Sequence, residues 1–381
     1  MNNKNLIQFT QKSVQTTSIT GQERTFIQLV SNEMNVLGYD RVWIDDAGTV
    51  IGEINGISPG KTILLDAHAD TVSVNPEDWT FEPFSGIIHQ DRIYGRGVAD
   101  TKGNLAAMMY AAAKVDRKKI SGKIFVSATV NEEVFEGGSL RVVIDQTQPD
   151  YVIIGEATNL NLNRGGRGRA EIIVETLGQS AHSSSPEVGE CAVHNMIRLI
   201  NSIESQQMKT DPILGPGSMV LTDIISAPFP GNSVVPNRCR VTFDRRLLVG
   251  ETIASLENEL LEYANRANVE CRIYLLDATE ITYTGYKIQG KKFFPAWLFP
   301  QDHILVEKSY KALKKSIPEC KLGTFRFCTN GAYSAGISGI PTIGFGLGKE
   351  TDAHTADESI AINDLMKATI GYQAIIEELL S

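Results

Sequence analysis

Histidines and carboxylates of the kind that bind metal ions are spread from residue 68 to residue 354 of the chain. The set consists of His68, Asp70, Asp100, Glu132, Glu133, Glu156 and His354. Two histidines and three carboxylates are enough to hold two divalent metal ions. One glutamate of the adjacent pair is then left as a free base. This inventory is the strongest functional signal in the sequence.

The chemistry that such a set could perform is the hydrolysis of an amide bond. That reaction needs an activated water and a stabilised oxyanion at neutral pH. Two metal ions held ~3.5–4 Å apart serve both needs, because they lower the pKa of a bridging water and polarise the carbonyl. Histidine and carboxylate ligands suit zinc, and cobalt or manganese could substitute. We therefore expect two divalent metal ions, with zinc as the first choice.

Each motif taken alone also has an ordinary structural interpretation. In an extended segment His68 and Asp70 share a face, so Asp70 could accept the second imidazole N–H of His68, or simply cap a loop. Asp100 follows two glycines and could be a helix N-cap. Adjacent side chains at a strand end point in opposite directions, so one residue of Glu132-Glu133 could bind metal while the other faces the water.

The remaining motifs are equally ambiguous by themselves. Glu132-Glu133 could form a solvated acidic turn, Glu156 could be a loop acid, and His354 could be a surface histidine. Their joint occurrence after apolar runs is what favours a metal site.

Four short apolar runs must position these residues. They cover residues 62–65, 123–130, 151–154 and 342–345, and each is followed by a candidate ligand. A helix is expected over 102–115, and Thr20 to Glu23 resembles a capping box at the start of another. Alternating strands and helices predict an α/β sheet, whose active site gathers beyond the carboxyl ends of its strands.

The middle of the chain has a different pattern. The expected elements are a strand, a helix, two strands, a helix and a strand, over 169–177, 187–203, 219–226, 239–247, 252–264 and 270–276. This β-α-β-β-α-β order is typical of a ferredoxin-like domain. We therefore expect an inserted domain over 167–288, between two parts, 1–166 and 289–381, of a catalytic domain.

Composition excludes several classes of protein. A chain of 381 residues favours two domains, and its formal charge of −9 argues against a nucleic-acid partner. The longest apolar stretch, 105–113, is too short to cross a membrane, and the N-terminal residues lack the apolar segment of a secretory signal. A cytoplasmic location is expected. The five cysteines contain no CxxC pair and are expected to be reduced thiols.

These motifs together resemble one known family. LLDAHADTV at 64–72, Asp78-Trp79 with Phe84, GRGVADTKG at 95–103, NEE at 131–133, GEAT at 155–158 and Ala353-His354 are similar to motifs of the dinuclear zinc amidohydrolases and exopeptidases. That family includes acetylornithine deacetylase, succinyl-diaminopimelate desuccinylase, aminoacylase and glutamate carboxypeptidase. The pattern, with 244–246 and 294–297, most resembles a hydrolase branch associated with selenium or purine metabolism.

The resemblance implies a mixed-sheet catalytic domain like that of zinc peptidases, and a role for each residue. Asp100 would bridge both metals. His68 and Glu156 would complete one site, and Glu133 and His354 the other. Asp70 would orient His68. Glu132 would take a proton from the metal-bridging water and pass it to the leaving amine.

In this family the inserted ferredoxin-like domain acts as a lid and a dimer surface. His182 matches a lid histidine that stabilises the oxyanion, often from the partner subunit; alone it could be an exposed turn histidine. Arg246 is placed to bind a substrate carboxylate, or to form a surface ion pair, and Asn232 matches a substrate asparagine. Asn330 and Gly331 are also expected to contact the substrate. Ala332 stands where the desuccinylases have an arginine, which argues against diaminopimelate.

The function expected from the resemblance is the hydrolysis of a small N-acyl amino acid or related derivative, of the deacetylase or desuccinylase type. A dipeptidase or carboxypeptidase with the same metal site is an alternative. A catalytically silent protein that binds small molecules is the alternative from another class. The expected partners are an amino-acid-derived substrate and a second copy of the chain, joined through the inserted domain, with no nucleic acid and no membrane.

Overall fold

The computed structural model describes residues 3–381, which divide into two compact units. The first unit extends to Gly166 and includes Thr279–Gln289 and Trp297–Ser381. The second comprises Arg167–Ala278 and Gly290–Ala296. Segment 279–289 thus lies in the first unit, although the sequence suggested the inserted domain as far as 288. The hydroxyl groups of Tyr283 and Thr284 donate to the carbonyl oxygens of Gly48 and Asp46, at 2.8 and 2.7 Å, and hold it there.

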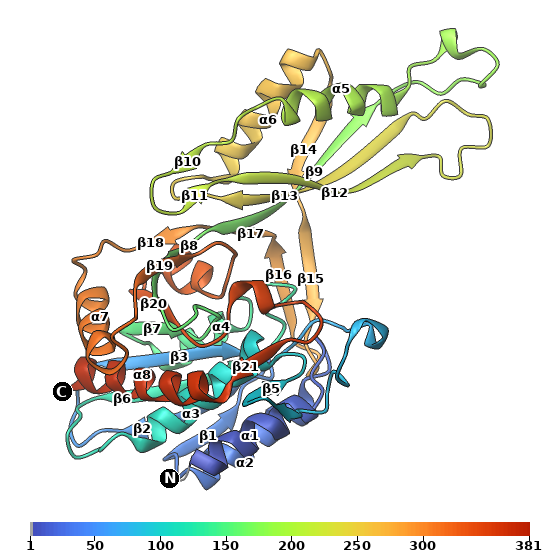
Figure 1. The fold of residues 1–381 in the computed structure, drawn as a ribbon. Helices are drawn as coiled ribbons and strands as arrows, with labels where there is room; N and C mark the ends of the chain where they lie inside the picture. Colours follow the sequence, from blue (N-terminus) through green and yellow to red (C-terminus); the bar gives the residue numbers. More distant parts are fainter. Residues whose placement is uncertain (1–2) are drawn as a thin grey trace. The chain divides into compact units, whose positions relative to one another are not determined.

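A nine-stranded mixed sheet forms the centre of the first unit (Figure 1). Its strands are β1 (Arg41–Ile44), β2 (Val50–Asn55), β3 (Thr62–His68), β6 (Lys123–Thr129), β7 (Tyr151–Ile154), β8 (Leu162–Gly166), β18 (Trp297–Leu298), β19 (Leu322–Phe325) and β20 (Thr342–Phe345). The order is β1-β2-β6-β3-β7-β20-β8-β18, with β19 beside β8. Because β6, β3, β7 and β20 run parallel while β1, β2 and β8 pair antiparallel, the predicted α/β class with a mixed sheet is confirmed.

Helices cover both faces of this sheet (Figure 1). They are α1 (Asn3–Gln15), α2 (Arg24–Val36), α3 (Gly103–Lys114), α4 (Leu140–Thr147), α7 (Ile304–Ser316) and α8 (Ile362–Leu380). Alternate residues of β3 point to opposite cores: Ile63 and Leu65 join the cluster with α1, α2, α3, α7 and α8, whereas Leu64 joins the one with α4. The apolar run at 62–65 is therefore continuous because both faces are buried.

A small sheet brings the C-terminal part of the chain to the segment before Asp100. It contains β4 (Ile88–His89), β5 (Arg92–Tyr94) and β21 (Ser359–Ala361), and Ser359 is the register partner of Tyr94. A two-stranded ribbon of β15 (Asp277–Ile281) and β16 (Lys287–Lys291) stands where the chain passes between the units. Among residues 3–381, none of the helices has the length and apolarity that a membrane crossing needs.

The second unit has the expected β-α-β-β-α-β order. Its main elements are β9 (Gly168–Leu177), α5 (Ala192–Glu204), β12 (Ser218–Ala227), β13 (Arg238–Leu247), α6 (Ile253–Ala267) and β14 (Cys271–Leu275), with short strands β10 (Thr210–Asp211), β11 (Gly215–Pro216) and β17 (Phe293–Phe294). The sheet order is β12-β13-β9-β14, and β17 also pairs with β9. One face packs on α5 and α6 through its own core. Helix α5 begins later than predicted, because Gln179 and Glu190 pair as a bridge just before it.

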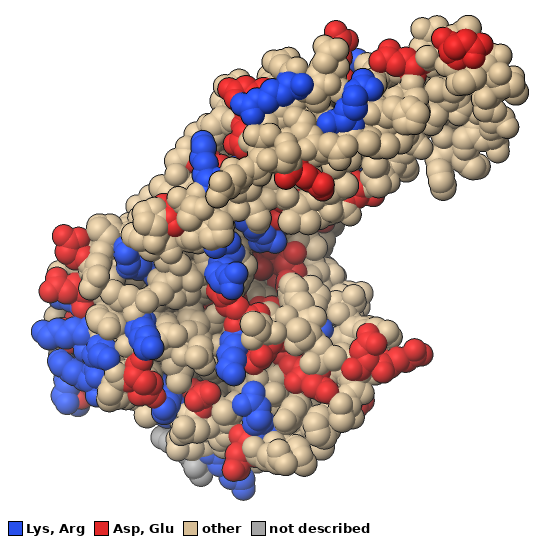
Figure 2. Space-filling view, turned by 45° about the horizontal axis from the view of Figure 1, so that its top comes forward, with Lys and Arg blue, Asp and Glu red and all other residues tan. Residues whose placement is uncertain are grey.

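The cysteines and the distribution of surface charge are two further features of the structure. The five cysteines, all in the described part of the chain, are free. On the face drawn in Figure 2, lysines and arginines are interspersed with aspartates and glutamates instead of forming one continuous basic surface.

Candidate metal centre

Four neighbouring parallel strands deliver the candidate ligands to one edge of the sheet. His68 is the last residue of β3, Glu132 and Glu133 follow β6, and Glu156 follows β7. His354 stands in the longer loop after β20. Because the carboxyl ends of parallel strands share an edge, residues far apart in the sequence meet there.

Asp100 lies between the two histidines. Its Oδ1 is 3.0 Å from His68 Nε2, and its Oδ2 is 3.2 Å from His354 Nε2. Glu133 Oε2 lies 3.0 Å from His354 Nε2, and Glu156 Oε1 lies 3.6 Å from His68 Nε2. The carboxylate of Asp100 therefore presents one oxygen to each histidine, as a bridging ligand would.

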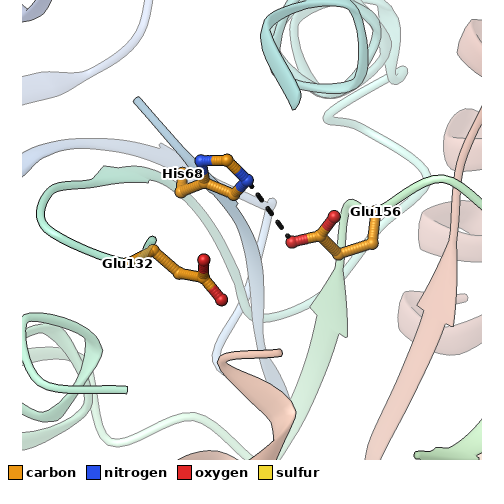
Figure 3. Close-up of side chains that lie close together, drawn as sticks. All are labelled: His68, Glu132 and Glu156. Atoms are coloured by element: carbon orange, nitrogen blue, oxygen red, sulfur yellow. Dashed lines mark ion pairs between the residues drawn. The ribbon is translucent and has the colours of Figure 1, made fainter. Parts of the chain in front are cut away.

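The side chains form two overlapping groups with the spacing of metal ligands. His68, Asp100 and Glu133 form one, and His68, Glu132 and Glu156 form the other, with ligand atoms within 4.8 Å of one another in each. Figure 3 shows the second group converging from three different segments. Glu132, the residue expected to act as the base, thus lies among the ligands themselves.

His68 and Asp70 interact differently from the expectation. His68 Nδ1 is 2.9 Å from the backbone carbonyl oxygen of Asp70, and 3.8 Å from its carboxylate. A carbonyl can only accept, so Nδ1 carries the proton and Nε2 faces Asp100. The expected bond to the Asp70 carboxylate is wrong. That carboxylate accepts the backbone N–H groups of Glu132 and Glu133 instead, at 3.0 and 3.2 Å.

The predicted capping box at Thr20 is also wrong, for a related reason. The Thr20 hydroxyl donates to Asp70 Oδ2 at 2.9 Å, and helix α2 begins only at Arg24. The Glu23 carboxylate accepts the backbone N–H groups of Gly21 and Asn131, at 3.0 and 3.3 Å. Both side chains therefore support the turn that carries Glu132 and Glu133.

Burial dominates the electrostatics of the site. It raises the pKa of Glu132 and of Glu156 well above the usual value for glutamate, and repulsion between carboxylates adds to this. Burial also acts to raise the pKa of Asp100, but hydrogen bonds from His354 and His68 outweigh it and lower the pKa overall. Hydrogen bonds to Asp100 and Glu133 raise the pKa of His354 to about 10.

The charge balance of this cluster fits cations. Asp100, Glu132, Glu133 and Glu156 are four carboxylates in one small volume. Within residues 3–381, the ion-pair partners of Asp100, Glu133 and Glu156 are the two histidines alone. An excess of buried negative charge is costly unless a cation compensates it. The oxygen and imidazole donors are those that divalent zinc, cobalt or manganese accept.

Three expected site residues lie in the second unit. Segment 181–183 pairs with 233–235 through backbone hydrogen bonds, so His182 and the loop of Asn232 are neighbours. His182 is exposed, and its Nδ1 accepts the backbone N–H of Ser184 at 3.1 Å. Arg246 on β13 is half-buried, and its Nε lies 2.9 Å from Asp244 Oδ1.

Asn330 and Gly331, also expected to contact the substrate, have structural contacts of their own. Asn330 is buried; its amide nitrogen donates to Asp66 and Thr129, at 2.8 and 3.0 Å, and its oxygen accepts the N–H of Gly137 at 2.6 Å. A Cβ on Gly331 would approach the Trp297 ring to 2.7 Å. These contacts give both residues a structural role, and their expected contact with the substrate stays a prediction.

Two buried acids close to the site were missed. Asp66 accepts the Ser127 hydroxyl at 2.6 Å and the Asn330 amide, and a carboxylate inside the apolar run of β3 was a usable signal. Glu358 accepts hydrogen bonds from the segment that ends at Asp100. It follows a polar stretch that resembles any surface loop, so no local pattern identified it.

Comparisons with known proteins found a family match, related sequences and a similar fold. A family model described as peptidase family M20/M25/M40 matches residues 64–378. The uncharacterized protein YgeY of Escherichia coli (strain K12) is 33% identical over 365 residues, which cover 93% of this chain and 89% of that protein. Acetylornithine deacetylase of Vibrio atlanticus (strain LGP32) is 28% identical and covers 86% of each chain. Aminopeptidase PepT from Bacillus cereus has a similar structure, with a TM-score of 0.78 at 20% identity, over 100% of this chain and 99% of its own.

Proposed function

The chain belongs to peptidase family M20/M25/M40 and is a hydrolase of amide bonds, and from this premise we propose that its substrate is a small N-acyl amino acid or a related derivative. The observation that carries the proposed metal-assisted hydrolysis is the position of Asp100, whose two carboxylate oxygens each face a different histidine. A dipeptide is the alternative substrate, because the same centre could cleave either amide.

The proposed ligands divide between two cations that share Asp100. His68 and Glu156 would hold one, and Glu133 and His354 the other. When bound, the two cations would acidify the attacking water and polarise the scissile carbonyl. Zinc is the proposed metal, with cobalt or manganese as substitutes.

Glu132 is the proposed general base. The Asp70 carboxylate accepts the backbone N–H of Glu132 at 3.0 Å. This hydrogen bond fixes the backbone position from which the Glu132 side chain extends beside the proposed ligands. Burial raises the pKa of Glu132 above its usual value, which makes its carboxylate a stronger base for taking a proton from water and passing it to the leaving amine. Both proton transfers would occur at its carboxylate oxygens.

Three side chains of the second unit are proposed to bind the reacting substrate. Because His182 Nδ1 accepts the Ser184 N–H, the neutral imidazole carries its proton on Nε2 and can donate it to an oxyanion. Arg246 uses Nε for Asp244, which leaves its terminal nitrogens to bind a carboxylate in a bidentate manner. Asn232 is proposed to bind the substrate from the loop beside His182.

The proposed substrate class is tested by turnover. The purified protein, loaded with zinc, cobalt or manganese, is assayed against N-acetylornithine, other N-acyl amino acids and dipeptides, with Glu132→Gln as the inactive control. Faster cleavage of the acyl amino acids supports the proposal, and preference for dipeptides assigns the alternative. Absence of turnover of every compound with all three metals overturns both.

The proposed binding of the substrate carboxylate by Arg246 can be tested separately. Arg246→Gln should raise KM about 10-fold or more for acyl amino acids, since a bidentate charged hydrogen bond contributes on the order of 1.5–3 kcal/mol. Arg240→Gln, on the same strand but exposed, is the matched control. An unchanged KM in Arg246→Gln removes this residue from substrate binding.

We also propose a homodimer formed through the second unit. Strand β12 stands at one end of its sheet and exposes Val220, Ile224 and Ile225, at 55%, 51% and 48% of their surface. An exposed apolar edge strand favours pairing with another chain. Ile224→Lys should give a monomer by light scattering, while Ile370→Lys, on α8, should not. A monomeric parent protein refutes the dimer.

A further inference from the structure

Glu358 connects the two segments that carry His354 and Asp100. It is almost fully buried, at 1% exposure, and lies four positions after His354. Its Oε2 accepts Arg96 Nη1 at 2.8 Å and the backbone N–H of Gly97 at 2.9 Å. Its Oε1 accepts the backbone N–H groups of Ala99 and Asp100, at 2.7 and 3.1 Å. One carboxylate thus receives four donors from the segment that ends at the bridging ligand.

We propose that Glu358 is a positioning residue of the metal centre, which fixes the backbone of Asp100 in the place where its carboxylate meets both histidines. The inference rests on the proposed metal centre and adds a residue that touches neither the metals nor the substrate. Loss of an outer residue that orients a ligand typically costs about 10- to 100-fold in metal affinity or activity.

The surrounding backbone explains why a carboxylate is needed there. Strand β21 begins directly after Glu358 and pairs with β5, and the N–H of Gly95 donates to the Glu358 carbonyl oxygen at 2.9 Å. The chain then turns at Gly97, where the φ of +81° favours glycine and an added Cβ would come within 2.5 Å of Thr71 Cγ2. This turn aims several N–H groups inward, and an anionic acceptor satisfies them all at once.

Arg96 supplies the compensating charge. Its guanidinium is buried at 4% exposure and lies 5.2 Å from the centre of the Trp79 ring. Within residues 3–381, Glu358 is the carboxylate that pairs with it. Removing the charge of Glu358 would therefore leave a buried cation unpaired beside the metal-binding segment, which is unfavourable.

The chain offers a matched control for the change from carboxylate to amide. Asp45 is also a buried acid that accepts two backbone N–H groups, from Gly48 and Thr49, but both bind Oδ1. Its Oδ2 is buried without a partner. Asp45→Asn can keep both hydrogen bonds on one oxygen. Glu358→Gln cannot keep all four of its hydrogen bonds, because each carboxylate oxygen accepts two donors and an amide NH2 accepts none.

The experiment compares metal binding by the full-length parent protein, Glu358→Gln and Asp45→Asn after removal of metal. Zinc affinity is measured by competition with a chelator, and the geometry of the site by the visible spectrum of bound cobalt. Glu358→Gln should lose about 10- to 100-fold in zinc affinity, the usual effect of losing an outer partner, and should alter the cobalt spectrum. Asp45→Asn should match the parent in both.

Glu358→Asp provides a second measurement that keeps the charge opposite Arg96 but shortens the side chain by one methylene. Its zinc affinity should lie between those of the parent and Glu358→Gln, and it remains informative if the glutamine variant does not fold. Parent-like affinity and spectrum in a folded Glu358 variant would overturn the positioning role alone. A parent protein that binds neither zinc nor cobalt would instead overturn the metal centre itself.

Discussion

The imidazole of His68 is held by the backbone carbonyl of Asp70, at 2.9 Å from Nδ1, and not by the Asp70 carboxylate, which lies 3.8 Å away. The backbone thus sets the tautomer of the ligand, and the carboxylate is available for another task. It binds the N–H groups of Glu132 and Glu133, and so couples the proposed base to the strand that carries His68.

Asp70→Asn should therefore impair catalysis more than metal binding. The carbonyl that orients His68 is unchanged, whereas one of the two oxygens that hold Glu132 and Glu133 becomes a donor. We expect zinc affinity within about threefold of the parent and kcat reduced by about 10- to 100-fold. Thr20→Val, which removes only the hydroxyl donor to the same carboxylate, is the control. A loss of zinc affinity as large as that of His68→Ala would restore the direct role of the carboxylate.

The Glu132→Gln variant distinguishes the two possible roles of Glu132, general base and metal ligand. Glu132 lies within metal-ligand spacing of His68 and Glu156, so both roles are geometrically possible. If it is the base, kcat should fall by about 10²–10⁴-fold while the zinc content stays at the parent level. Glu136→Gln, at a nearby buried acid, controls for the loss of a carboxyl group. Loss of one zinc per chain would identify Glu132 as a ligand.

Stability of the metal-free protein should fall as pH rises from 5 to 7. Burial raises the pKa of Glu23 from 4.5 to about 7 and that of Asp66 from 3.8 to about 6, and Glu132 and Glu156 shift in the same direction. The folded chain then binds more protons than the unfolded chain. The resulting stabilisation is complete below the pKa of these groups in the unfolded chain, and it is lost as the pH rises through their pKa in the folded chain. Each pKa unit corresponds to about 1.4 kcal/mol, so a decrease of a few kcal/mol is expected in urea denaturation.

Saturating zinc should oppose this dependence. Metal ligands must be deprotonated, so the stabilisation by zinc should grow over the same pH range. Stability of the metal-free protein that rises between pH 5 and 7 would contradict the burial of these acids.

Gly331→Ala should destabilise the fold without a specific effect on substrate binding. The new methyl group would lie 2.7–2.8 Å from atoms of the Trp297 ring, and overpacking of this kind costs about 1–3 kcal/mol. Trp297→Phe in the same chain should recover part of the loss, which a double-mutant cycle would measure. Gly231→Ala, at a site with no heavy atom closer than 3.8 Å, should be neutral. A raised KM at unchanged stability would support the expected contact of Gly331 with the substrate.

Local patterns in the sequence were sufficient for the class of the fold. Continuous apolar runs predicted buried parallel strands, because both faces of β3 and β7 are covered by helices. Polar residues within three positions of the end of such runs mark the carboxyl ends of the strands, and His68 and Glu156 were identified from this signal together with the other motifs. The order of elements in the second unit followed from the same periodicities.

Which donor meets which acceptor was decided only by the tertiary structure. Thr20, Asp70 and Glu132 come from three separate segments, and their hydrogen bonds replaced both the predicted capping box and the predicted Asp70–His68 contact. Asn330 and Glu358 likewise found partners that lie more than two hundred residues away. Periodicity is a property of neighbouring residues and can be read locally. A buried polar group is satisfied by whatever the folded chain brings beside it, and that depends on the packing of the whole sheet.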